Sequence, residues 1–160
     1  MDIDDLRGQA VAAFRDLEVP DSVTFESLRE LLEEDRGKRI VIRPVRHLGQ
    51  DRVSGLWLSL PRTDLILHAE TASELHRQQI ILHEFAHMVL DHGLREDGTQ
   101  FAALLPELDP EVVARCLARC QDHSHEEVAA EALADLFAAA IARTRRASRD
   151  EPLNFRGVFG

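Results

Sequence analysis

The sequence is short of basic residues, of cysteine and of long apolar runs, and each shortage narrows the possible functions. Lys and Arg together number 19 against 29 Asp and Glu, so the formal net charge is −10. Nucleic-acid affinity rests mainly on basic side chains that neutralise phosphates, and the charge therefore argues against direct nucleic-acid binding. A DNA-binding helix in "SLRELLEEDRGKRI" is the weakest hypothesis, because acids nearly balance bases there and no clear recognition helix follows.

No charged-then-apolar leader opens the chain, and no apolar run approaches the roughly 18 residues needed to cross a bilayer. We therefore expect a cytoplasmic protein without a membrane partner. The two cysteines, Cys116 and Cys120, lie four positions apart in an expected helix. This spacing favours two buried thiols over a structural disulfide, with metal ligation as the alternative.

Apolar spacing predicts an α+β fold that begins with two helices. Helical periodicity covers residues 1–17, and Pro20 closes this helix. In the second helix Thr24 and Ser27 offer capping oxygens, and Gly37 is a natural end.

Three short apolar runs, at 39–45, 53–60 and 64–69, predict a small three-stranded sheet. From Thr71 the apolar period becomes helical and continues to Gly93, after which "LREDGTQ" reads as a polar loop.

Two more helices are expected in the second half of the chain. Asp109 and Pro110 signal the start of one, and an alanine-rich helix begins near Ser124. With 160 residues, a single domain over residues 1–147 is expected to fold without disulfide or metal support. Residues 148–160 read as a loose C-terminal tail.

The stretch "QQIILHEFAHMVLDHG", residues 78–93, places two histidines and a glutamate inside an apolar helix. His83 and His87 share one helix face, because each residue turns the helix by about 100°. Two neutral imidazoles in this arrangement can hold one Zn²⁺, and Glu84 can accept a proton from a metal-bound water. The pattern is the HExxH motif of zinc peptidases.

A catalytic zinc normally has three protein ligands and one open position, so a further ligand is needed. The candidates are His92, His123, His125, Glu126, Glu127 and Glu131. His92 lies beyond the helix face of the pair, and metzincin spacing is not met because position 90 is Leu and position 93 is Gly.

Glu131 is the favoured third ligand, with Glu127 as the fallback. The neighbours of Glu131 are mostly Ala, Leu, Val and Phe, which predicts a buried helix where a carboxylate needs a partner such as a metal. Asp135, one turn further on, can orient a histidine ligand through a hydrogen bond.

"HEFAHMVLDH", followed downstream by "EALADLFAAAI", resembles the ImmA/IrrE family of metallopeptidases, and more narrowly its short actinobacterial members labelled regulator or toxin components. The resemblance covers residues 25–142, including "GLWLSL", "DLILHAE" and "LHRQQIILHE". It implies a zincin-like core in which His83 and His87 bind zinc, Glu84 is the base, and Glu131 on a second helix is the third ligand. It also implies a regulatory substrate, commonly a helix-turn-helix repressor or antitoxin encoded nearby.

The chain departs from the family in two respects. It lacks the DNA-binding and sensor domains of some members, and it has no tyrosine to stabilise the transition state. His123, just before the Glu131 helix, is the candidate oxyanion donor, and a surface-loop histidine is the alternative. The rival function is an interaction module with a vestigial or structural metal site. Glu84 argues against that rival, because a purely structural site has no use for a base.

Overall fold

The computed structural model describes residues 2–46, 54–71, 73–92, 94–95 and 124–159 of the chain. The described elements, in chain order, are α1 (Ile3–Asp16), α2 (Phe25–Arg36), β1 (Arg39–Val45), β2 (Gly55–Ser59), β3 (Thr63–Ala69), α3 (Glu74–Val89), β4 (Leu94–Arg95) and α6 (Ser124–Phe159). The expected α+β class is confirmed.

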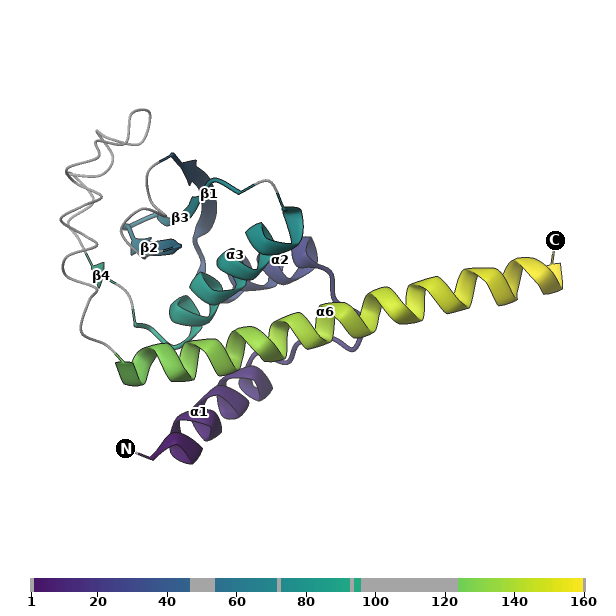
Figure 1. Ribbon diagram of the computed structural model, residues 1–160, viewed down its shortest axis with the longest axis horizontal. Helices are drawn as coiled ribbons and strands as arrows, with labels where there is room; N and C mark the ends of the chain where they lie inside the picture. Colours follow the sequence, from purple (N-terminus) through teal and green to yellow (C-terminus); the bar gives the residue numbers. More distant parts are fainter. Residues whose placement is uncertain (1, 47–53, 72, 93, 96–123, 160) are drawn as a thin grey trace.

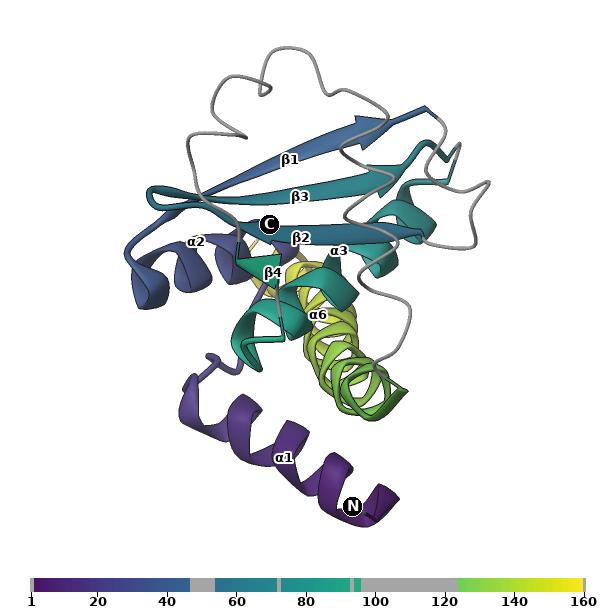
Figure 2. The ribbon, with the colours of Figure 1, turned by 90° about the vertical axis from the view of Figure 1, so that its left-hand side faces the viewer.

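The sheet is mixed, with strand order β1-β3-β2-β4. β1 pairs parallel to β3, and β2 pairs antiparallel to β3. These are the three strands that the sequence predicts, and the two-residue β4 adds to the free side of β2. In Figure 2 the helices α2 and α3 lie along one face of this sheet.

Both ends of α2 follow from the sequence. The Thr24 side chain accepts a hydrogen bond from the backbone N–H of Ser27, and the Ser27 hydroxyl accepts one from the N–H of Thr24. This reciprocal pair satisfies two amide groups that have no partner inside the helix. Gly37 ends the helix in the left-handed region, with φ of 65°, where glycine has no steric penalty.

The helices stack below the sheet in successive layers. α3 packs between the sheet and α6, and α1 packs against the outer side of α6 (Figures 1 and 2). The core between these layers is apolar and comprises, among others, Ile40, Trp57, Ile66, Ile81, Phe85, Met88, Leu133 and Phe137. The C-terminal part of α6 runs on beyond the other elements (Figure 1).

One buried polar group ties α2, the sheet and α3 together, and we call it the Arg36 cluster (Arg36, Trp57 and Asp64). The Asp64 carboxylate is fully buried and accepts hydrogen bonds from the Nε and Nη2 atoms of Arg36 and from Trp57 Nε1. Arg36 Nη1 also donates to the Met88 carbonyl near the end of α3. A fork of donors matched to a carboxylate in this way fixes the relative positions of three elements.

Several predicted boundaries were wrong. α3 begins at Glu74, because Ser73 accepts a capping hydrogen bond from the His76 N–H, and it ends at Val89, four residues before Gly93. β4 replaces the first two residues of the expected polar loop. Residues 148–159 continue α6, where the sequence predicts a loose tail. The expected boundary between residues 147 and 148 therefore falls inside a helix.

The helix expected after Asp109 lies outside the described residues. No helix in the described part of the chain is long and apolar enough to cross a membrane.

Candidate metal centre

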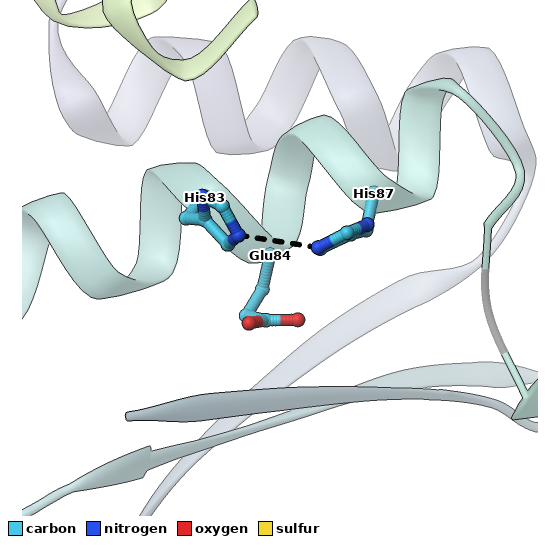
Figure 3. Close-up of side chains that lie close together, drawn as sticks. All are labelled: His83, Glu84 and His87. Atoms are coloured by element: carbon cyan, nitrogen blue, oxygen red, sulfur yellow. Dashed lines mark hydrogen bonds between the residues drawn. The ribbon is translucent and has the colours of Figure 1, made fainter. Parts of the chain in front are cut away.

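α3 presents His83 and His87 on one face and Glu84 beside them (Figure 3). The two imidazole rings turn edge to face, with centroids 4.8 Å apart, and their Nε2 atoms lie 3.2 Å from each other. The Glu84 carboxylate points instead toward the strands (Figure 3). One ligand atom from each of the three residues lies within 4.8 Å of the others, so the group can hold a metal ion.

A carboxylate from α6 completes the contacts of the two imidazoles. Glu127 Oε2 lies 2.8 Å from His83 Nε2, and Glu127 Oε1 lies 3.0 Å from His87 Nε2. We call these four residues, His83, Glu84, His87 and Glu127, the histidine cluster. Its side chains from two helices meet because α3 and α6 pack along each other.

The donor atoms of the two histidines and Glu127 are of the kinds that bind a divalent metal ion, and their spacing can be compared with that of zinc ligands. Zinc ligands at about 2.0–2.2 Å in tetrahedral geometry are separated from each other by roughly 3.3–3.5 Å. The three observed separations are 3.2 Å between the two imidazole nitrogens, 2.8 Å from His83 to Glu127 Oε2 and 3.0 Å from His87 to Glu127 Oε1. We call this arrangement the donor triangle, with the two Nε2 atoms as two corners and the Glu127 carboxylate group as the third. The side chain of His87 is 12% exposed and that of Glu127 is 56% exposed, so one side of the triangle faces solvent.

The Glu84 side chain extends from α3 to Gly55, the first residue of β2. Glu84 is only 6% exposed, whereas the side chain of the adjacent His83 is 27% exposed. A Cβ atom placed on Gly55 would lie 2.9 Å from Glu84 Oε1 and 2.9 Å from Ile80 Cγ2. Carbon atoms do not approach so closely, and the absence of a side chain at position 55 therefore makes room for the Glu84 carboxylate.

The protonation equilibria of the cluster are displaced by this environment. Burial raises the pKa of Glu84 to about 7, against an ordinary value of 4.5, even though the charges of His87 and His83 oppose the shift. Burial lowers the pKa of His83, but the Glu127 hydrogen bond and the surrounding carboxylates outweigh it and leave the pKa raised. Hydrogen bonds from His83 and His87 lower the pKa of Glu127. In the metal-free protein, the pKa of Glu84 therefore lies near neutral pH, so both the protonated and the ionised forms are populated there.

Glu131 does not share these contacts. Glu131 and Asp135 are both exposed, so the expectation that they lie buried on α6 was wrong. The outward face of α6 carries these two carboxylates, while Leu133 and Phe137 face the core. The Glu131 charge still acts on His83, one helical turn from the Glu127 contact. Its role as third ligand stays a prediction, and Glu127, the fallback, makes the direct contacts.

The structure describes three of the other candidate ligands. His125 is exposed, Glu126 is half-buried, and His92 contacts the far side of His87. His123, Cys116 and Cys120 lie outside the described residues.

Sequence reasoning missed two features of this region, Gly55 and the Arg36 cluster. Gly55 carries no local signal, because a glycine at the start of a strand is common and its close neighbour lies on another element. Arg36 and Asp64 are 28 positions apart and each looks like an ordinary surface charge in the sequence. The hint that Asp64 needed a partner was its position directly before the apolar run 65–67 of a predicted strand.

Comparison of the chain with family models, with curated proteins and with solved structures found no match.

Proposed function

We propose that the protein is a zinc-dependent endopeptidase that cleaves a regulatory protein, with His83, His87 and Glu127 as ligands and Glu84 as the base. The observation that carries the proposal is the triangle of donor atoms around two imidazoles, with a buried carboxylate beside it whose pKa is near 7. A site that used metal for folding alone would need no such base, and would close with a fourth protein ligand.

The chain's own residues divide the work as follows. Zinc, when bound, supplies a Lewis acid that brings the pKa of water to about 7 and polarises a peptide carbonyl. Glu84 accepts the proton from the attacking water and passes it to the leaving amine. Glu127 and the two histidines hold their donor atoms in place through α3 and α6.

The substrate class comes from the sequence resemblance to the ImmA/IrrE metallopeptidases. That resemblance points to a helix-turn-helix transcriptional regulator or an antitoxin, cleaved at one site. A substrate of this kind suits a cluster whose Glu127 side faces solvent, since a protein chain must reach the metal from solvent.

The deciding experiment compares wild type with Glu84→Gln. The amide is nearly isosteric with the carboxylate but accepts no proton, so zinc content and fold should persist while cleavage is lost. The measurement is co-expression with the helix-turn-helix protein encoded nearest the gene, with mass spectrometry to detect new N-termini in that protein. Metal content is measured on the same preparations.

Glu74→Gln is the matched control, because it makes the same exchange at an exposed position of α3. It should leave cleavage unchanged. Equal regulatory output from wild type and Glu84→Gln would overturn proteolysis and establish the interaction module in its place. A wild-type protein without zinc would overturn the metal site itself.

A further inference from the structure

The end of α3 is shaped so that His92 returns to the helix it has just left. The N–H of His92 donates to the His87 carbonyl at 2.9 Å, and the N–H of Asp91 donates to the Met88 carbonyl at 3.1 Å. This pair of bonds is a Schellman motif, which requires a left-handed residue between its two arms. Asp91 takes that conformation, with φ of 58°, where glycine is the usual residue. Asp91 therefore has an unfavourable backbone conformation at the turn that brings His92 back toward α3.

The two nitrogens of the His87 ring face different partners. Nε2 faces His83 Nε2 at 3.2 Å and Glu127 Oε1 at 3.0 Å. Nδ1 faces Nδ1 of His92 at 3.3 Å. Since the two nitrogens of an imidazole point away from each other, His92 lies on the opposite side of the ring from the donor triangle. His92 is therefore not a further ligand in this arrangement.

A neutral imidazole carries one N–H and one lone pair, and only the nitrogen with the lone pair can bind a metal. An acceptor at Nδ1 holds the proton there and leaves Nε2 free. In most metal sites this acceptor is a carboxylate, a backbone carbonyl or water. Here the atom in that place is a ring nitrogen of His92.

We propose that His92 is a positioning residue that accepts a hydrogen bond from His87 Nδ1 and so fixes the ring and its tautomer for zinc binding through Nε2. The inference rests on the proposed function for its metal, but it concerns a residue that the HExxH motif does not contain. It also gives the Schellman turn at Asp91 a purpose, because a straight continuation of α3 would carry residue 92 away from the face of His87.

The test measures zinc affinity of the full chain by competition with a chromophoric chelator. His92→Ala and His92→Phe remove the acceptor, and both should weaken zinc binding by about 10–100-fold. His92→Asn places a carbonyl oxygen close to the position of Nδ1, so its affinity should stay within a few-fold of wild type. His76→Ala, an exposed histidine of the same helix, is the control and should bind zinc like wild type.

A second readout is the tautomer of His87 in the zinc-loaded protein, where Glu127 no longer competes for a proton on Nε2, from the ¹⁵N chemical shifts of the His87 ring. Wild type and His92→Asn should show the proton on Nδ1, whereas His92→Ala should show a mixture of tautomers. A merely structural residue would lower stability without this pattern of loss and rescue.

The outcomes separate the two proposals. If wild type binds zinc and Glu84→Gln abolishes cleavage, yet His92→Ala and His92→Phe bind zinc normally, the role of His92 is overturned and the proposed function stands. If wild type binds no zinc, both fail. Loss of affinity in all three His92 variants, Asn included, would also overturn the hydrogen-bond role.

Discussion

Two polar clusters adjoin α3, and each contains a buried carboxylate in a different electrostatic environment. Asp64, in the Arg36 cluster, is fully buried and accepts three hydrogen bonds, two of them from a guanidinium. Glu84, in the histidine cluster, is 6% exposed, and burial is the largest influence on its pKa. The first arrangement stabilises the ionised Asp64 carboxylate, and its hydrogen bonds link α2, the sheet and α3. The second arrangement leaves the Glu84 carboxyl with a pKa near 7 in the metal-free protein.

The difference follows from the partners that the fold supplies. Arg36 reaches Asp64 from the last turn of α2 and is permanently charged. The cations near Glu84 are His83 and His87, whose neutral forms are the ones that bind metal. A histidine partner therefore leaves the protonation of Glu84 adjustable, whereas an arginine partner would suppress it.

The largest effect is expected when the Arg36 cluster is broken. Arg36→Met removes the guanidinium and leaves the Asp64 carboxylate buried without its charge partner, which should lower the free energy of unfolding by about 3–5 kcal/mol. The side chain of Arg36 is 18% exposed, so the lower end of that range is expected. Urea denaturation measures the loss.

Two variants sharpen this result. Arg43→Met exchanges an exposed arginine of β1 and should change stability by less than about 0.5 kcal/mol. Adding Asp64→Asn to Arg36→Met should recover part of the loss, because no unpaired charge remains. If Arg36→Met lowers the free energy of unfolding no more than Arg43→Met does, the Arg36 cluster does not stabilise the fold.

The next effect concerns which carboxylate of α6 completes the histidine cluster. Glu127→Ala should weaken zinc binding by more than the roughly 100-fold that loss of a merely orienting group can cause. Glu131→Ala and Asp135→Asn should each change it by less than about 10-fold, because both residues are exposed and outside the donor triangle. Chelator competition ranks the three. The reverse order for Glu127 and Glu131 would restore the ligand that the sequence favours and shift the contact by one helical turn.

The sequence predicted those parts of the fold that depend on local rules. Thr24, Ser27 and Gly37 mark the ends of α2 correctly because capping acts within one helical turn. The three strands and the shared face of His83 and His87 follow from periodicity alone.

The failures involve tertiary position or rare conformations. Whether Glu127 or Glu131 faces α3 depends on the rotation of α6, and in the sequence Glu131 has the more apolar neighbours of the two. The end of α3 was misplaced because Asp91, a non-glycine residue, adopts the left-handed conformation. The pairing of Arg36 with Asp64 depends on a contact between α2 and β3 that no local pattern encodes.

The buried charge of Glu84 should appear in the pH dependence of stability of the metal-free protein. Its folded pKa of about 7 exceeds the ordinary 4.5, so the folded chain binds more protons than the unfolded chain between these values. Stability is therefore lost as the pH rises from about 4.5 to 7. Position 84 does not titrate in Glu84→Gln. The free energy of unfolding of this variant should equal that of wild type below pH 4.5 and exceed it by about 3 kcal/mol above pH 7.

Chelator-treated samples unfolded in urea at several pH values measure this difference. Glu74→Gln, on the exposed side of α3, should track wild type within about 0.5 kcal/mol throughout. A constant difference between Glu84→Gln and wild type from pH 4 to 8 would mean that Glu84 does not titrate in this window.

The smallest effect is expected at Gly55, where one methyl group tests how tightly the histidine cluster is built. In Gly55→Ala the new Cβ would meet Glu84 Oε1 and Ile80 Cγ2 at 2.9 Å, so the carboxylate or the strand must move. Overpacking of this kind should cost about 1–2 kcal/mol of stability. Cleavage should fall in kcat more than in KM, because the base moves while the substrate surface does not, and zinc content should remain unchanged. Gly8→Ala in α1 is the matched control, since a Cβ there meets nothing within 4 Å, and it should stabilise the helix by about 0.5–1 kcal/mol. If Gly55→Ala behaved like Gly8→Ala, the Glu84 carboxylate would have room to spare, and the contrast with the closely bonded Asp64 would then lie in charge alone.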